Sequence, residues 1–200
     1  MPTQPAVAVL GFRPHTYWTS AVALAGPVDA PSVIERRRIT FAVGDERMVF
    51  HRAEQTDIEA ARALIEDVRA ATEANAAREI GALLEDLKRD GVAVAVAVVP
   101  EAINKLPEAL EDILKVHARM HAAEGDFYRA VVATACARVG LAVHRAVERE
   151  LPALAAGHLG VNIAAVETLL KTMGAALGPP WSEDYKLATL AAWLHLDEDD

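Results

Sequence analysis

The chain has 200 residues, of which 52% are hydrophobic and 24% charged, and its formal net charge is -9. This length and composition are ordinary for a globular protein with one substantial core. The acidic balance gives no electrostatic support to a protein that coats nucleic acid non-specifically. The single cysteine, Cys136, excludes a disulfide framework and a thiolate metal cluster, and we expect it to be a buried, inert thiol.

The first fifty residues alternate apolar runs with turns. Residues 6–12 are apolar on both faces, as in the central strand of a covered sheet, and residues 19–25 follow as a second strand. Residues 32–43 predict a third strand and residues 47–51 a short fourth. We therefore predict an antiparallel meander at the start of the chain.

From residue 56 the hydrophobic period becomes that of a helix. Thr56 and Glu59 have the spacing of a capping box, and the helical spacing continues to Leu87, before Gly91. Because a straight helix of this length would overrun a domain of this size, we expect a break or bend near Asn75.

The rest of the chain alternates between strand and helix. Residues 92–99 contain only Val and Ala, which is typical of an interior parallel strand. A helical pattern begins at Pro107, a second begins with Asp126 as its N-cap, and residues 141–147 predict another strand. The remainder is helical, over residues 151–176 and then, with Ser182 as N-cap, to residue 196.

An antiparallel start followed by alternating helices and strands predicts an α/β fold, a mixed sheet with helices on both faces. That order is the ribonuclease H-like topology. We expect one such domain over residues 1–196 and a solvated acidic tail over residues 197–200. The sequence has no signal-peptide pattern and no apolar run of membrane-spanning length, so we expect a cytoplasmic protein without a membrane partner.

Three segments resemble the RuvC-type Holliday-junction resolvases. Gly-Phe-Arg-Pro at residues 11–14, followed by Tyr17 and Trp18, resembles their first strand, which carries Gly, an apolar residue, Asp and Pro before a turn. Residues 92–99 resemble the central strand that supplies the second carboxylate. Asp184 and the alanine-rich run after it resemble the final helix. The resemblance implies a protein related to nucleic-acid processing.

The same resemblance places Arg13 where the family has its first carboxylate. The second would fall near the end of residues 92–99, where Glu101 is the nearest acid, and only Asp184 matches. Two-metal phosphodiester cleavage needs convergent carboxylates that hold two magnesium ions about 4 Å apart. The resemblance therefore implies a divergent site with at most one divalent metal ion, Mg²⁺, Mn²⁺ or Zn²⁺.

The polar elbow after the first strand is the most site-like cluster in the sequence. Arg13 and His15 lie at a strand end, where crossover folds bind their ligands, and they predict an anion or phosphate contact. The alternative is that these residues form an internal salt bridge, to Asp184 or Glu124.

His117, His121 and Glu124 are spaced i, i+4 and i+7, so they share one face of a helix. Two histidines four residues apart have the spacing of a helical zinc chelate, in which Glu124 is a third ligand or a general base. The alternative is a polar stripe beside the core.

Asp184 and Lys186 lie in the first turn of the last helix. Asp184 is either a site carboxylate or a compensation of the helix dipole, whereas Lys186 opposes the dipole and predicts a partner charge or a ligand. Trp18 and Trp181 either flank a groove that stacks a base or pack in the core. Residues 36–38, all arginine, alternate faces of a strand and form either a solvated edge or a small basic patch for nucleic acid.

Two functions remain open at this point. In the first, a nuclease-type hydrolase acts on nucleic acid, with histidine as acid or base. Its pocket contains Arg13, His15, Glu124, Asp184 and Lys186. In the second, the fold has lost that chemistry and is a binding or assembly module, whose small-residue helices support a protein partner or a homo-oligomer. Convergence of Arg13, His121, Glu124 and Asp184 in one cleft is the geometry that distinguishes them.

Overall fold

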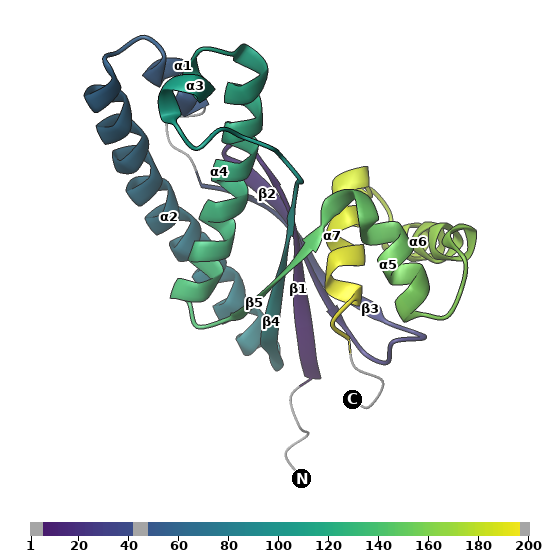
Figure 1. Cartoon of the computed structure of the whole chain (residues 1–200). Coiled ribbons are helices and arrows are strands. Elements are labelled where there is room, and N and C mark those ends of the chain that lie inside the picture. Colours follow the sequence, from purple (N-terminus) through teal and green to yellow (C-terminus); the bar gives the residue numbers. More distant parts are fainter. Residues whose placement is uncertain (1–5, 42–47, 197–200) are drawn as a thin grey trace.

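The computed structural model describes residues 6–41 and 48–196. Within them, one five-stranded sheet lies between two layers of helices (Figure 1). The order of its strands is β3-β2-β1-β4-β5. They are β1 (Ala6–His15), β2 (Trp18–Ala25), β3 (Ser32–Thr40), β4 (Val92–Glu101) and β5 (Ala142–Val147).

The strand pairing confirms the predicted mixed sheet. β1 pairs antiparallel with β2, and β2 with β3, whereas β4 runs parallel to β1 and to β5. Gly11 of β1 lies opposite Val98 of β4. The carboxyl ends of β1, β4 and β5 therefore meet at one edge of the sheet, the edge at which crossover folds bind their ligands.

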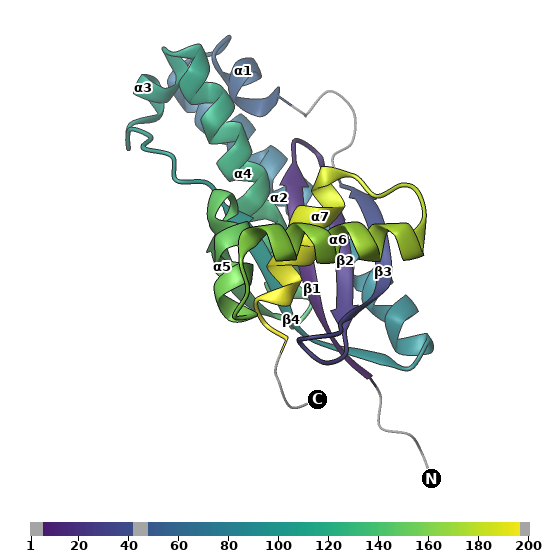
Figure 2. The same ribbon diagram turned by 90° about the vertical axis from the view of Figure 1, so that its right-hand side faces the viewer.

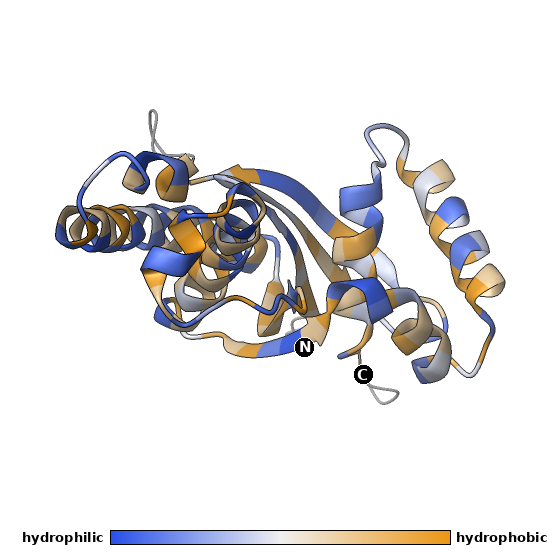
Figure 3. Ribbon diagram, turned by 45° about the horizontal axis from the view of Figure 1, so that its top comes forward, coloured by the Kyte–Doolittle hydropathy of each residue, from blue (hydrophilic) through white to orange (hydrophobic). Residues whose placement is uncertain are grey.

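The two helical layers differ in size. α1 (Val49–Ala53), α2 (Ile58–Arg89), α3 (Leu110–Leu114) and α4 (His117–Arg138) form one layer. The other contains α5 (Leu151–His158), α6 (Ile163–Leu177) and α7 (Glu183–Trp193) after a 3-10 turn, η2 (Glu148–Glu150). Figure 2 shows α6 crossing the outer side of α7. Figure 3 shows apolar and polar residues alternating along the long helices, as expected for helices that bury one face.

Strand β1 supplies both cores because its side chains alternate between the two faces of the sheet. Those that join the core of the α1–α4 layer are Ala8, Leu10 and Phe12, all fully buried. Val9 joins the core under α5–α7. Gly11 faces α7, and a Cβ atom there would lie 1.8 Å from the backbone oxygen of Ala188. The absence of a side chain at Gly11 is therefore what lets α7 rest on the sheet.

The structure corrects the expected strand at residues 47–51. Residue 47 lies outside the described residues, and Val49–Ala53 is a short helix, α1. Its buried residues, Val49, Phe50 and Ala53, have helical spacing, but five residues are too few for that period to be recognised in the sequence. The expected third strand is confirmed as far as Thr40, and residues 42 and 43 lie outside the described part.

Helix α2 also differs from the expectation, because it runs without a break through Asn75 for 32 residues. It contacts α1 and α3 as well as α4 and the sheet, so its length is not limited by the width of the sheet. The predicted N-cap, Thr56, is wrong by one residue, since Asp57 is the N-cap and its side chain accepts from the Ala60 amide at 2.9 Å.

The helical pattern from Pro107 divides into α3 and α4, and Asp126 is not an N-cap. Helix α4 continues through Gly125 and Asp126 because Phe127 and Tyr128, which follow them, are buried against the core. The helical stretch expected over residues 151–176 is two helices, α5 and α6, and the break between them contains Gly160, whose φ is 62°.

No single helix in the described ranges is both long and apolar enough to cross a membrane. The segments Glu148–His158 and Ile163–Leu177 meet that criterion only when they are taken together, and they are bent by 96°.

Candidate functional site

The candidate site begins at the tight hairpin that joins β1 to β2. His15 and Trp18 are the last paired residues before a two-residue turn, and Tyr17 in that turn has a φ of 65°. A non-glycine residue rarely adopts this left-handed conformation. The hairpin thus holds the side chains of the elbow at the carboxyl end of β1.

Arg13 forms an ion pair with a glutamate that the sequence did not suggest. Its Nη2 lies 3.2 Å from Oε1 of Glu148, in the 3-10 turn after β5, and its Nη1 donates to the Pro14 carbonyl at 2.7 Å. Glu148 Oε2 also contacts Arg129 of α4, at 3.3 Å. One carboxylate therefore bridges two guanidinium groups.

Each of these arginines keeps one unused donor. Nε of Arg13 and Nε of Arg129 are buried and have no hydrogen-bond partner among the described residues. The two side chains are only 19% and 13% exposed, so neither group is a freely solvated surface charge. Glu148 is the carboxylate that both guanidinium groups contact.

A second set of contacts joins the hairpin to α7. His15 Nε2 donates to Asp184 Oδ1 at 2.7 Å. The His15 ring is stacked on Trp18 with centroids 4.0 Å apart, and the Arg38 guanidinium lies 3.9 Å from the centre of the Trp18 ring. The Trp18 ring therefore packs between the His15 ring and the Arg38 guanidinium.

The carboxylates at this edge contact cations of the protein itself. Arg13 stands two residues beyond the Gly11 pairing with β4, at the position where the resemblance implies a carboxylate. The acids around it, Glu148 and Asp184, already contact protein cations, and Glu101 Oε2 lies 3.5 Å from Arg145.

The geometry that would distinguish the two functions, convergence of Arg13, His121, Glu124 and Asp184, is not seen among the contacts of the described residues. No hydrogen bond or ion pair within the described ranges joins Arg13 or Asp184 to His121 or Glu124. The alternative expected for Arg13 and His15, an internal salt bridge to Asp184 or Glu124, is found for His15, which pairs with Asp184, whereas Arg13 pairs with Glu148.

Glu124 instead lies below a group of histidines on the α1–α4 layer. The rings of His117 and His121 are 4.5 Å apart, as their spacing on one helical face predicts. The third member of the group is His51 of α1, which offers a nitrogen within 4.8 Å of theirs. Glu124 is 2% exposed and contacts the group from the core side.

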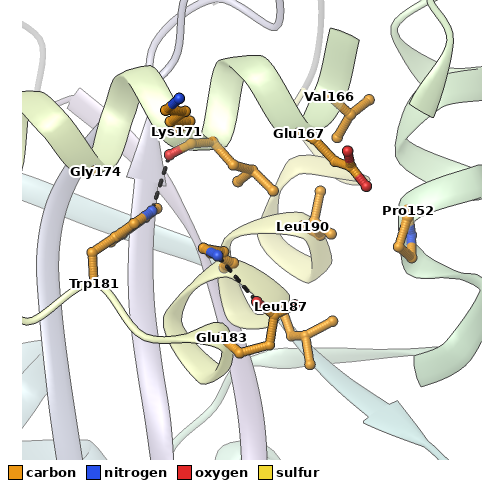
Figure 4. A pocket seen from close by; sticks show the side chains of 11 residues that line it. Pro152, Val166, Glu167, Lys171, Gly174, Trp181, Glu183, Leu187 and Leu190 are labelled. Atoms are coloured by element: carbon orange, nitrogen blue, oxygen red, sulfur yellow. Dashed lines mark hydrogen bonds and ion pairs between the residues drawn. The ribbon is translucent and has the colours of Figure 1, made fainter. Parts of the chain in front are cut away.

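Trp181 and Lys186 lie in a third place, a cleft of about 520 Å³ between α5, α6 and α7 (Figure 4). Trp181 Nε1 donates to the Leu170 carbonyl at 2.9 Å, and its ring lies against Gly174. Lys186 pairs with Glu183 at 3.1 Å, which is the partner charge that its place in the first turn predicted. These contacts make Trp181 a packing anchor, and they separate Lys186 from Asp184.

The three arginines of β3 are used mostly within the protein. Arg36 donates to four carbonyl oxygens, including those of Gly178 and Pro180 at 2.9 and 2.6 Å. Arg37 pairs with Asp86 and Glu35, and Arg38 lies over Trp18. These contacts leave less unpaired positive charge on β3 for the basic patch that was one of the two alternatives.

Sequence reasoning missed Glu148, Arg129 and His51. Glu148 contacts Arg13 and Arg129, which are both distant from it in the sequence. No local sequence pattern indicates contacts of this kind. His51 lies in a helix of only five residues, where a period of 3.6 has no room to appear.

No protein-family model and no curated protein sequence matches the chain. Among solved structures, it is similar to "T. thermophilus RuvC in complex with Holliday junction substrate", with a TM-score of 0.53 and 11% identity over 94% of this chain and 92% of that one. It is also similar to "Thermus thermophilus RuvC structure", with a TM-score of 0.48 and 13% identity over the same shares. At such identities the likeness establishes the fold alone, and with the sheet topology it shows an α/β fold of the ribonuclease H-like type.

Proposed function

We propose that this protein binds nucleic acid at the carboxyl edge of β1 and that it does not cleave it by two-metal hydrolysis. The observation that carries the proposal is the cluster of Arg13 and Arg129 around Glu148, at the position where a nuclease of this fold needs a carboxylate. A guanidinium there repels metal ions and attracts phosphate.

The ligand class comes from the fold comparison. The similar RuvC structure is described as a complex with a Holliday junction substrate. A branched DNA is therefore the first ligand to test. The net charge of -9 makes non-specific binding weak, so we expect affinity to depend on a few local arginines and on salt.

The chemistry of binding is an exchange of anions. A backbone phosphate that displaces Glu148 would accept from Arg13 and Arg129, whose planar forks suit phosphate oxygens. His15, held by Asp184 and stacked on Trp18, stays at the rim of the same edge. Glu148 thus acts as a built-in competitor of the ligand.

The test is fluorescence anisotropy with a labelled four-way junction, a duplex of equal length and a single strand. We expect Arg13→Gln to weaken junction binding and Glu148→Gln to strengthen it, because the latter frees two guanidinium groups. Arg149→Gln is the matched control, since Arg149 is 74% exposed and, within the described residues, pairs with Glu150 at 3.8 Å. Equal losses in Arg13→Gln and Arg149→Gln would contradict a site at Arg13.

Cleavage is measured on the same substrates with Mg²⁺ and then with Mn²⁺. We expect intact DNA in both. Cleavage products that disappear in Asp184→Asn would overturn the non-catalytic part of the proposal, because that carboxylate would then have a catalytic role.

A second candidate function is a protein assembly module. It is favoured by three large apolar side chains, Leu154, Val161 and Ile163, which are 41–45% exposed around the turn from α5 to α6. Light scattering after size-exclusion chromatography distinguishes the two functions. A stable oligomer that Ile163→Lys dissolves, together with no binding to any DNA, would favour assembly.

A further inference from the structure

Three histidine rings from two helices meet on the α1–α4 layer. His117 and His121 come from the first two turns of α4, and His51 comes from α1. Ring centroids are 4.9 Å apart for His51 and His117, 4.7 Å for His51 and His121, and 4.5 Å for His117 and His121. One nitrogen from each ring lies within 4.8 Å of the other two.

The packing of α1 on α4 fixes this meeting. Phe50 lies edge-on to Phe127 with centroids 6.2 Å apart. The Phe50 amide donates to Glu124 Oε1 at 3.2 Å, so α1 is tied to α4 through both its backbone and its side chains. His51, the next residue, is thereby held above the α4 histidines.

Glu124 lies behind the rings as a buried acceptor. Its Oε1 also accepts from His51 Nδ1 at 3.0 Å, and its Oε2 is 4.0 Å from His121 Nδ1. With its Nδ1 proton donated to Glu124, His51 carries its free lone pair on Nε2. A carboxylate that orients a ligating imidazole in this way is the usual outer partner in histidine metal sites.

Two polar atoms of this cluster are unused. Nε2 of His51 and Oε2 of Glu124 are buried and have no hydrogen-bond partner among the described residues. Glu124 as a whole is 98% buried, since its exposed fraction is 2%. A buried carboxylate without a full set of donors is costly, and a cation bound to the imidazoles would compensate its charge.

We propose that His51, His117 and His121 bind a divalent transition metal ion, Zn²⁺ by ligand preference, with Glu124 as the carboxylate that orients His51. Three imidazoles and no oxygen ligand suit zinc, and Mg²⁺ prefers oxygen ligands. Tetrahedral zinc with Zn–N distances of about 2.0 Å needs nitrogens roughly 3.3 Å apart. The ligand nitrogens lie within 4.8 Å of one another, and rotation of the exposed His117 and His121 side chains would bring them to the shorter separation that zinc needs.

The metal would have one position left over. Three protein ligands leave a fourth coordination site, which the exposure of His117 and His121 directs toward solvent for water or another ligand. This site is separate from the ion pairs at Arg13, so it does not depend on nucleic-acid binding. Its effect on the fold is to link α1 to α4.

The experiment uses the full chain with any affinity tag removed, stripped with a chelator and dialysed. ZnCl₂ is titrated by calorimetry, CoCl₂ by the visible absorption of tetrahedral cobalt, and MgCl₂ serves as the control ion. We expect one Zn²⁺ per chain. At a hundredfold excess over Kd we expect a rise in Tm of roughly 5 to 10 °C, and Mg²⁺ should produce neither binding nor a shift.

The variants locate the metal. His51→Gln and His121→Gln should lose zinc binding, and Glu124→Gln, which keeps an acceptor for the Phe50 amide, should weaken it by about 10- to 100-fold. His144→Gln is the matched control, because His144 pairs with His195 elsewhere in the fold, with ring centroids 4.1 Å apart. Circular dichroism confirms that each variant folds. Unchanged binding in His121→Gln, equal loss in His144→Gln, or an equal Tm shift with Mg²⁺ would overturn the proposal.

Discussion

At the scale of single residues, Gly11 has the most sharply defined role in the fold. A Cβ atom at this position would lie 1.8 Å from the Ala188 oxygen and 2.6 Å from the Ala192 nitrogen, both backbone atoms of α7. Because backbone atoms cannot rotate away, we expect Gly11→Ala to push α7 off the sheet and to reduce the free energy of unfolding by roughly 3 kcal/mol or more.

Gly81→Ala is the control for that change, since the nearest atom to its new Cβ is a Val139 methyl carbon at an ordinary 3.8 Å. This substitution lies inside α2 and should stabilise the protein by roughly 0.5–1 kcal/mol. Urea unfolding measures both. A Gly11→Ala protein as stable as the wild type would contradict the close contact between β1 and α7.

Cys136 gives a second prediction at this scale. Burial raises the pKa of its thiol to about 12. At pH 8 about one molecule in ten thousand would carry the reactive thiolate. We expect iodoacetamide to leave the folded protein unmodified and to alkylate one cysteine in denaturant, as mass spectrometry would record. Rapid alkylation of the native protein at pH 8 would mean that the thiol is accessible.

The residues of the candidate site could be predicted only in part. Arg13 and His15 were found because they follow an apolar strand, and the resemblance gave Arg13 its significance. Their partners, Glu148 and Asp184, lie 135 and 169 residues further along the chain, and only the fold brings them together. His117 and His121 were found by helical spacing, whereas His51 had no local signal.

At the scale of elements, an ion pair between Arg37 of β3 and Asp86 of α2 links the two elements, and its stability depends on the ionisation of the Asp86 carboxyl. Arg37 Nη1 lies 2.8 Å from Asp86 Oδ2, and the hydrogen bond from Arg37 holds the pKa of the Asp86 carboxyl below its ordinary value of 3.8. Because the pKa of Asp86 is lower in the folded state than in the unfolded state, the pair stabilises the fold at pH values above the unfolded-state pKa. This contribution is lost as the pH falls through the lowered pKa of the folded state.

We therefore expect Arg37→Met to have a lower urea midpoint than the wild type at pH 7, with a difference that narrows below about pH 4. Arg36→Met is the matched control. Arg36 donates to backbone carbonyls such as those of Gly178 and Pro180, which do not titrate, so its deficit should be constant with pH. A constant difference for Arg37→Met would show that the Asp86 pair contributes nothing to the pH dependence.

The elements themselves were largely predictable, and the exceptions have physical causes. The apolar run of β2, most of that of β1 and the second half of that of β4 are buried on both sides, so their composition alone identifies them. The expected bend at Asn75 assumed that helix length follows sheet width. α2 also supports α1 and α3, and a helix that packs on helices beyond the sheet has no reason to end there.

At the scale of the whole molecule, one sheet is shared by two cores. The larger core lies under α1–α4 and includes Leu83, and the smaller lies under α5–α7 and includes Leu190. Strands β1 and β4 contribute side chains to both. If one helical layer unfolded, apolar residues of the same strands would become exposed to water. We therefore predict that the two layers unfold together in one cooperative transition, as expected for a single domain.

Leu83→Ala and Leu190→Ala test it as a matched pair, because their side chains are 1% and 3% exposed in the two cores. Each should cost about 2–5 kcal/mol. Two of the three tryptophans, Trp181 and Trp193, lie in the smaller core, so fluorescence reports mainly on that core, and far-ultraviolet circular dichroism is dominated by the long helices α2 and α4. We expect both probes to give one midpoint in the wild type and to shift together in each variant. If Leu190→Ala moved the fluorescence transition and left the circular dichroism transition in place, the layer of α5–α7 would unfold as a unit of its own and the chain would contain two domains.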